Sequence, residues 1–342
     1  MLFSHFSYFF IFKLALQRLI QYWLSSCLMY KVMQFRRLVS LVCCCLLLLA
    51  LIGRLRREIK TSRHARTFEQ FELFKVCKNQ KRRDDVSLSK LVLDSILVSD
   101  QHKILFCETP QAGDVEWKKL LIAASGDYPS VEDIPENLIH DHKNNGWPRL
   151  SSLTPQEITH RLNTYFKFII VRDPFERLIT TFEEKFLFRK PTEVCFQHTI
   201  APAIIHRYRK DFPFLADTGL MFDEFVRYLA DADARETMDW QFGRNIVHWA
   251  TYAELCAPCD VRYDAIGRHE TLERDATQIL RKAGIERVAS SPLINPGITR
   301  DNKTKVERYF AGVSKQDIRR LYERYEVDFH LFGYPTPDFL LN

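Results

Sequence analysis

The sequence lacks the features that would place it in several common classes of protein. Its formal charge is only +6, from 49 basic and 43 acidic residues, so it has no dense Lys/Arg excess of the kind that binds nucleic acid. It has no GxxxxGKS or GxxxxGKT stretch, which excludes a P-loop kinase or NTPase, and it has no internal repeat or low-complexity tract. With 342 residues, 46% of them hydrophobic, it can bury the core of one large domain or two small ones. Its mild positive charge suits an anionic substrate or cofactor.

One apolar run near the N-terminus contains no charged residue. Residues 38–53, LVSLVCCCLLLLALIG, have arginines on both sides. The run is slightly short for a spanning helix, but flanking arginines can snorkel to the interface, and short spans suit the thinner membranes of the early secretory pathway. A cleaved signal peptide is the alternative. Because arginines follow Gly53 directly and no small-x-small cleavage site is present, an uncleaved signal anchor is favoured.

This anchor divides the chain into four expected parts. Ahead of it is a cytoplasmic tail or an extension upstream of a start at Met33, with Lys13 and Arg18 interrupting a stretch that could also be a second membrane segment. A polar, basic stem follows the anchor, and a globular domain follows the stem. The expected boundaries are 1–37 for the tail or extension, 38–53 for the anchor, 54–90 for the stem and 91–342 for the globular domain.

Five of the nine cysteines lie after the anchor, namely Cys77, Cys107, Cys195, Cys256 and Cys259. In an oxidising lumen an odd number leaves one thiol free, and the pairings cannot be read from the sequence. Cys256 and Cys259, in LCAPC, have the spacing of zinc ligands, but no second close pair of ligands accompanies them. Disulfides are therefore favoured over zinc. A glycosylation sequon at Asn302 fits a lumenal surface.

Strand and helix patterns alternate along the C-terminal domain. KILFCET and YFKFIIVR are short apolar runs typical of buried strands. WKKLLIAAS has apolar residues at helical spacing, and DPFERLITTFEEKF begins with Asp173 as a helix N-cap. This alternation predicts an α/β fold with a mainly parallel central sheet flanked by helices. In such sheets ligands bind at the carboxyl ends of the strands.

Two strand–loop–helix units are candidates for such a site. The first, CETPQAGDVEW, would present backbone N–H groups around Gly113, which suits a phosphate or sulfate group. The second, VRDPFER, places Arg172 at the end of a strand, where its guanidinium can pair with a phosphate. Taken alone, the first could be an ordinary βα loop and the second a capped helix with a surface ion pair.

Four blocks of the chain, between about Lys103 and Tyr334, resemble the Golgi carbohydrate sulfotransferases that sulfate chondroitin, dermatan, terminal N-acetylgalactosamine or the HNK glucuronic-acid epitope. They are ILFCETPQAGDVEWKKLL, FIIVRDPFERLITTFEEKF, HWATYAELCAPCDVRYDAIGRHETLERDATQILRKAG and YFAGVSKQDIRRLYERYEVDFHLFGY. The resemblance implies a P-loop-like sulfotransferase fold and a single-pass type II Golgi membrane protein with a lumenal catalytic domain. It also implies 3′-phosphoadenosine 5′-phosphosulfate (PAPS) as donor, a glycan as acceptor and no metal.

The same resemblance implies that the first loop binds the 5′-phosphosulfate of PAPS. The family typically has Pro-Lys, two small or apolar residues, Cys, Ser or Thr, Asn and Trp there. In this chain Gln111 replaces the lysine, which would stabilise charge on the leaving phosphate, and Asp114 and Glu116 add negative charge. The candidate donor-binding residues of this loop are Pro110, Gln111, Ala112, Gly113, Asp114, Val115, Glu116 and Trp117.

By the same resemblance the second loop binds the 3′-phosphate, through Arg172 and through Thr180 in the position of a family serine. Gln111 and His248 are the catalytic candidates. Gln111 can still donate a neutral hydrogen bond, and His248, in VHWATY, could deprotonate the acceptor hydroxyl or be a structural histidine beside Trp249. Four basic residues could contact an acidic glycan or form an ordinary solvated face: Lys118, Lys119, Arg244 and Arg268.

These observations leave two hypotheses for function. The first is a carbohydrate sulfotransferase that moves sulfate from PAPS to a hydroxyl of a chondroitin- or dermatan-like or N-acetylgalactosamine-containing glycan in the Golgi. The alternative is a catalytically impaired pseudo-sulfotransferase that binds a glycan or a nucleotide at the membrane. No nucleic-acid partner is expected, and the sequence predicts no oligomeric state.

Overall fold

The structure is a computed structural model of the chain, and the part of it that can be described belongs almost entirely to the unit Phe68–Asn342. The described residues are 18, 76–77, 88–128, 130–139, 141, 145–188, 194–209, 219–285 and 302–341. The predicted anchor, residues 38–53, and most of the predicted stem lie outside them, so these boundaries stay predictions. None of the helices among the described residues combines the length and the apolar character needed to cross a bilayer.

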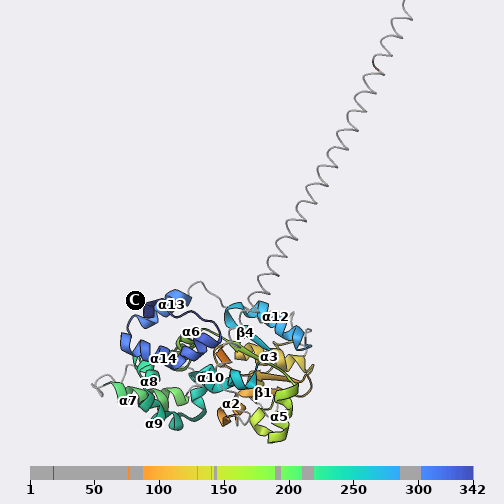
Figure 1. The fold of residues 1–342 in the computed structure, drawn as a ribbon, viewed down its shortest axis with the longest axis horizontal. Helices are drawn as coiled ribbons and strands as arrows, with labels where there is room; N and C mark the ends of the chain where they lie inside the picture. The colour runs from red at the N-terminus through yellow and green to blue at the C-terminus, as the bar shows by residue number, and fades with distance from the viewer. Residues whose placement is uncertain are drawn as a thin grey trace, which may run out of the picture. The chain divides into compact units, whose positions relative to one another are not determined.

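A four-stranded sheet forms the centre of the domain (Figure 1). Its order is β1 (Ile96–Ser99), β2 (Ile104–Cys107), β3 (Phe166–Val171) and β4 (Ala265–Arg268). The pair β1–β2 is antiparallel, whereas β2–β3 and β3–β4 are parallel. The predicted α/β fold with a mainly parallel sheet is therefore confirmed, and β2 and β3 are the two strands expected from their apolar runs.

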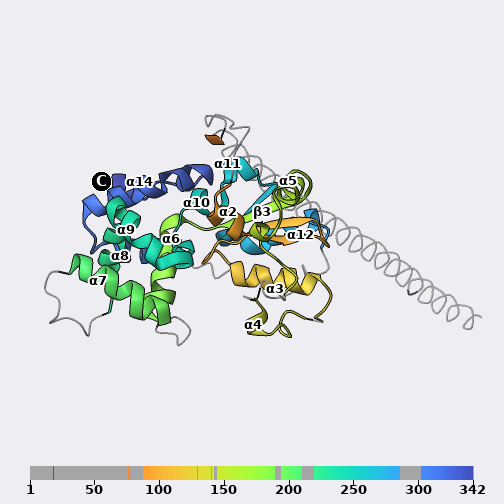
Figure 2. The same ribbon diagram turned by 90° about the horizontal axis from the view of Figure 1, so that it is seen from below.

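Helices cover both faces of this sheet, which explains why β1, β2 and most of β3 are apolar. On one face Phe106 and Phe168, which pair in register, pack against Trp117 of α3 (Asp114–Ala124). On the other face Leu105 and Ile169 share a core cluster with residues of α2 (Lys90–Ser95), α5 (Pro155–Thr164) and α10 (Tyr252–Cys256). Figure 2 shows α3 on one side of the strands and α5 on the other.

Close packing extends to β4, where Gly267 faces β3 and α12 (Leu272–Lys282). A Cβ atom at Gly267 would lie 2.6 Å from Cδ1 of Ile170 and 3.0 Å from Cδ1 of Ile279. The missing side chain therefore lets α12 approach the sheet.

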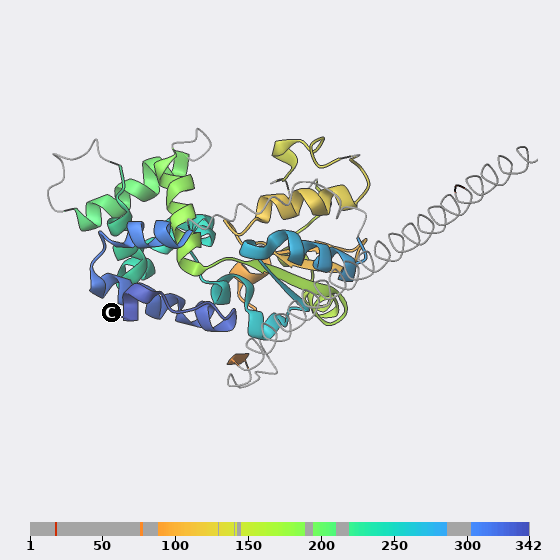
Figure 3. The ribbon, with the colours of Figure 1, turned by 90° about the horizontal axis from the view of Figure 1, so that it is seen from above.

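A mainly helical part lies beside the sheet (Figure 3). It has an aromatic core that includes Phe175, Phe225 and Phe329. Its longer members are α6 (Pro174–Phe182), α7 (Ala201–Tyr208), α8 (Phe222–Ala230), α9 (Ala232–Phe242), α13 (Asn302–Phe310) and α14 (Lys315–Leu331). The shorter α-helices of the whole domain are α4 (Glu136–Ile139), α11 (Pro258–Val261) and α15 (Asp338–Leu341). Its 3₁₀ turns are η1 (Leu150–Ser152), η4 (Gly243–His248) and η5 (His269–Thr271), and its π-helical turns are η2 (Glu183–Leu187) and η3 (Phe196–Ile200).

Two disulfides tie distant parts of the domain together. Cys77 pairs with Cys259, and Cys107 pairs with Cys256, while Cys195 is a free, exposed thiol. Each cysteine of LCAPC thus bonds a distant partner, which confirms the disulfide interpretation of that motif. In the described part of the chain there is also no group of three or more His, Cys, Asp or Glu residues arranged to hold a metal ion.

Candidate functional site

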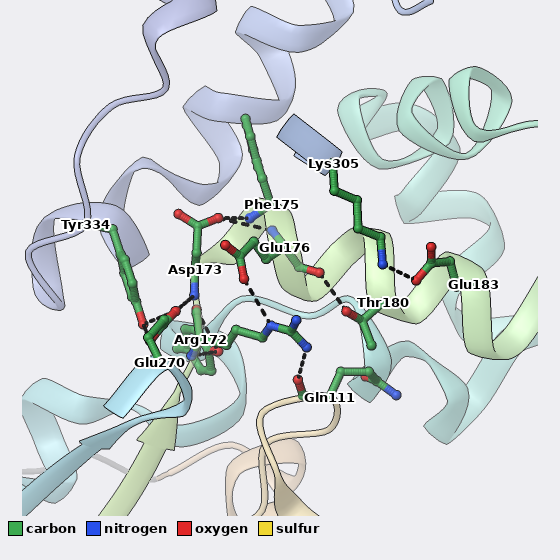
Figure 4. A network of polar contacts seen from close by, with 11 residues as sticks. Gln111, Arg172, Asp173, Phe175, Glu176, Thr180, Glu183, Glu270, Lys305 and Tyr334 are labelled. Atoms are coloured by element: carbon green, nitrogen blue, oxygen red, sulfur yellow. Dashed lines mark hydrogen bonds and ion pairs between the residues drawn. The ribbon is translucent and has the colours of Figure 1, made fainter. Parts of the chain in front are cut away.

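The loops after β2 and β3 meet at one edge of the sheet, because these strands are parallel neighbours. Nη1 of Arg172 donates to the main-chain oxygen of Gln111 at 3.2 Å, and Nε of Arg177 donates to the oxygen of Pro110 at 3.0 Å. The structure therefore brings the two predicted phosphate-binding units together into one site (Figure 4).

The first loop keeps a shape suited to an anion. Gln111 and Gly113 both have left-handed backbone conformations, with φ of 64° and 90°. Gly113 is the N-cap of α3 and makes no side-chain cap, so main-chain amides of the first turn remain available to a ligand. A left-handed non-glycine residue such as Gln111 is uncommon and is typical of functional sites.

The side chains of the predicted donor-binding residues in this loop differ in exposure. Trp117 and Ala112 are fully buried in the core beneath the loop, and Val115 packs partly against the same core. Pro110 is buried as well. The side chains of Pro110, Ala112 and Trp117 therefore shape the loop from within, whereas the other five residues of the predicted set are partly exposed: Gln111, Gly113, Asp114, Val115 and Glu116.

The predicted catalytic residues Gln111 and His248 are in contact. Nε2 of Gln111 lies 3.0 Å from Nδ1 of His248 and donates to Oε2 of Glu184 at 3.3 Å. Oε1 of Gln111 accepts from the hydroxyl of Thr181 at 3.2 Å. Glu184 was not predicted from the sequence. It lies on the π-helical turn η2, directly after α6. No spacing signal connects it with the first loop.

Burial lowers the pKa of His248 well below its ordinary value, and the positive charges of Lys185 and Arg177 add to the effect. The imidazole is therefore neutral near pH 7, the form that can accept a proton from a hydroxyl group. The ring also packs against Phe196, with 5.4 Å between ring centroids. A base role and a packing role are thus compatible in this position.

The acids of the first loop differ in their surroundings. Asp114 pairs with Nζ of Lys118 at 3.1 Å, and Lys118 also pairs with Glu108 at 2.7 Å. Burial would lower the pKa of Lys118, but the charges of Asp114 and Glu108 outweigh it and raise this pKa. The expectation that Lys118 could contact a glycan is wrong, because its side chain is 2% exposed.

The other three predicted glycan contacts also differ in exposure. The guanidinium of Arg268 lies 4.6 Å from the centre of the Tyr334 ring, so Arg268 makes a cation–π contact within the domain. Arg244 is 53% exposed, although it pairs with Asp94, and Lys119 is partly exposed. Arg244 and Lys119 are therefore the better placed of the four to meet an acidic ligand.

The second loop and helix α6 form a small cleft with α13. Arg172 and Thr180, the predicted 3′-phosphate ligands, line it together with Glu176, Ile179, Lys305 and Val306. Nε of Arg172 lies 3.4 Å from Oε2 of Glu176, and the hydroxyl of Thr180 donates to the main-chain oxygen of Glu176. Lys305 was not predicted from the sequence, because it comes from a helix far along the chain.

Asp173, the N-cap of α6, has an unusual environment beside this cleft. Its carboxylate accepts from the amides of Phe175 and Glu176, as predicted for an N-cap, while its own amide donates to Glu270 at 3.0 Å. Burial raises the pKa of Asp173 to about 7, and the nearby charges of Glu176 and Glu270 contribute. The Asp173 carboxyl group is thus about half protonated near pH 7.

Comparison with known proteins places these features in context. The sequence model described as "Sulfotransferase family" matches residues 94–335. Carbohydrate sulfotransferase 10 from Danio rerio is 56% identical over 274 residues, which cover 79% of this chain and 75% of the relative. The human protein of that name is 55% identical over 277 residues, covering 80% and 77%. Human carbohydrate sulfotransferase 9 is 34% identical over 248 residues, covering 71% and 53%. No solved structure matches the chain significantly.

Proposed function

Because the chain belongs to the sulfotransferase family, we propose that it transfers the sulfuryl group of PAPS to a hydroxyl group of a glycan. The observation that carries the proposal is the meeting of Arg172, Thr180 and the α3 loop at one edge of the sheet. Carbohydrate as the acceptor class is supported by the names of the relatives, which are carbohydrate sulfotransferases.

The two halves of the site suit PAPS unequally. Arg172 and Thr180 offer a positive charge and a hydroxyl to a 3′-phosphate, as an anion site requires. The loop of Gln111 offers main-chain amides and a neutral amide side chain to the phosphosulfate, but residues 108–113 include no basic residue. Glu184 adds a carboxylate beside Gln111. Nucleotide binding should therefore be better preserved than charge stabilisation during transfer.

This chemistry assigns separate tasks to the residues near Gln111. The Gln111 amide can donate a neutral hydrogen bond to the developing charge on the leaving group, where a lysine would donate a charged one. In this proposal His248, neutral near pH 7, takes the proton of an acceptor hydroxyl, and the alternative base is the carboxylate of Glu184, which accepts from the Gln111 amide.

The proposed location is the Golgi lumen, with residues 38–53 as a single type II membrane anchor. The two disulfides support an oxidising compartment. For the acceptor we propose a chondroitin- or dermatan-like or N-acetylgalactosamine-containing glycan. The exposed guanidinium of Arg244 and the partly exposed Lys119 would suit its acidic groups.

A second candidate function is a pseudo-sulfotransferase that binds the nucleotide or the glycan without turnover. The observation that favours it is the engagement of Gln111 with His248 and Glu184, combined with the missing lysine. A charged hydrogen bond made only in the transition state is worth about 1.5–3 kcal/mol, and losing it would slow transfer about 10- to 100-fold.

The deciding experiment measures transfer of labelled sulfate from PAPS by the full-length chain to desulfated glycosaminoglycans and N-acetylgalactosamine glycans. We expect slow transfer by the natural protein and about 10- to 100-fold faster transfer by Gln111→Lys, since the new ammonium group restores charge stabilisation. Gln111→Met is the matched control, because it keeps the size and removes the donor.

The outcomes separate the candidates. Transfer by the natural chain supports the enzyme, and the panel names its acceptor. No transfer by either protein, with a melting temperature that still rises on adding adenosine 3′,5′-bisphosphate, would favour the second candidate. No transfer and no nucleotide binding would overturn both.

A further inference from the structure

We propose that Lys305 is a ligand of the donor's 3′-phosphate, which it reaches by exchanging its ion pair with Glu183 for the phosphate. The proposal rests on the proposed function, since it extends the nucleotide site formed by Arg172 and Thr180. It adds a residue from α13 that neither the sequence pattern nor the family resemblance singled out.

Lys305 lines the same cleft as Arg172 and Thr180. Its side chain is 33% exposed, and Nζ lies 2.6 Å from Oε2 of Glu183. Figure 4 shows this ion pair next to Thr180, on the side of α6 that faces α13. Lysine has a flexible four-carbon stem with a compact charge, so it can turn from one acceptor to another.

Glu183, the present partner of Lys305, keeps other hydrogen-bond partners when this ion pair breaks. The other carboxylate oxygen of Glu183 accepts from the hydroxyl of Tyr309 at 2.9 Å, and Tyr309 lies one helical turn after Lys305 on α13. Glu183 is also partly accessible to water, with 16% of its side chain exposed. The departure of Lys305 therefore leaves Glu183 with a hydrogen bond and solvent.

Charge balance explains why a second cation is useful in this cleft. Arg172 already lies beside the carboxylate of Glu176, which offsets much of its charge. A phosphate monoester carries about −1.5 to −2 charges at pH 7. Lys305 adds a second positive charge, so the two cations offset more of the phosphate charge than Arg172 does alone. Because Gln111 supplies no positive charge to the other half of the nucleotide, donor affinity depends strongly on this cleft.

The test compares binding of adenosine 3′,5′-bisphosphate and 5′-AMP to the full-length chain by calorimetry. Lys305→Met should weaken the bisphosphate about 10- to 100-fold and leave 5′-AMP unchanged, because only the first has a 3′-phosphate. Lys305→Arg should keep affinity within a few-fold. Lys282→Met, an exposed lysine at the end of α12, is the matched control and should change neither affinity.

A further variant separates a ligand from a structural ion pair. Glu183→Gln removes the competing carboxylate, so the bisphosphate should bind equally well or several-fold more tightly. If Glu183→Gln weakens binding as much as Lys305→Met, or if Lys305→Met weakens both nucleotides equally, the pair is structural and the proposal fails. Normal bisphosphate binding by Lys305→Met would also overturn it while leaving the proposed function intact. A natural chain that binds no bisphosphate would overturn the donor site as a whole.

Discussion

Lys118 shows how one side chain determines what an acidic loop residue does. Asp114 lies in the first turn of α3, and the sequence alone predicts that its charge faces the ligand. In the structure Asp114 forms an ion pair with Lys118, which lies one helical turn later. Lys118 also forms an ion pair with Glu108. Lys118 therefore stabilises the loop and cannot replace the missing lysine at position 111.

This arrangement predicts that Lys118→Met lowers the free energy of unfolding by about 3–5 kcal/mol, because Asp114 loses its buried partner and Glu108 loses one ion pair but keeps that with Arg149. The partly exposed neighbour Lys119→Met is the control and should change stability by less than about 0.5 kcal/mol. Urea unfolding monitored by fluorescence gives both values. A Lys118→Met protein that is fully stable but no longer binds nucleotide would show that Lys118 serves the donor after all.

At the scale of elements, α14 is joined to the short helix α10 by a buried carboxylate. Asp328, fully buried in α14, accepts from the amides of Tyr252 at 2.7 Å and Ala253 at 3.1 Å, which open α10. These amides have no partner within their own helix. Burial raises the pKa of Asp328 to about 7, although the two amides act in the opposite direction.

A pH dependence of stability follows from this carboxyl group. Its pKa is about 7 when folded and about 3.8 when unfolded, so between these values only the unfolded state loses the proton. The group therefore favours the folded state most below pH 4, and its contribution falls as pH rises towards 7. Asp328→Asn removes this dependence and keeps an acceptor for one amide.

We expect the stability of Asp328→Asn, relative to the natural protein, to increase steadily from pH 4 to pH 7 and then to level off. Urea midpoints measured at four pH values across this range test the prediction. Other titrating groups cancel in the comparison, because both proteins contain them. A relative stability that falls over the same range would mean that the amides hold Asp328 ionised.

At the scale of the whole molecule, the two disulfides connect segments that are far apart in the sequence. Cys107 ends β2, just before the donor loop, and its bond to Cys256 joins that strand to α10. Cys259 lies three residues after Cys256 and forms a disulfide with Cys77, which precedes the sheet in the sequence. The position of the donor loop is therefore secured covalently as well as by packing.

Removing either disulfide should destabilise the protein by about 2–5 kcal/mol, because each bond closes a long loop of the unfolded chain. The test is the melting temperature of Cys256→Ser and of Cys259→Ser, with Cys195→Ser as the control that should be neutral. Peptide mapping without reduction should recover Cys77 linked to Cys259 and Cys107 linked to Cys256. Free alkylation of Cys256 in the unreduced protein would contradict the pairing.

Local patterns in the sequence were sufficient for much of the site. The apolar runs identify β2 and β3, the capping residue Asp173 identifies the start of α6, and the loops between them contain Gln111 and Arg172. Each of these signals lies within a stretch of about ten residues, where strand and helix periodicity act directly. The resemblance to carbohydrate sulfotransferases could be read from the same stretches, and the family match confirms it.

Only the tertiary structure showed which distant side chains meet these loops. Lys305, Glu184 and the cysteine partners come from separate elements, and Lys118 could be oriented only by knowing that it lies beneath the loop. Contacts of this kind depend on how helices pack against the sheet, and packing follows from shape and burial summed over the whole domain. A sequence pattern reports which face of an element is apolar, but it does not report what that face will touch.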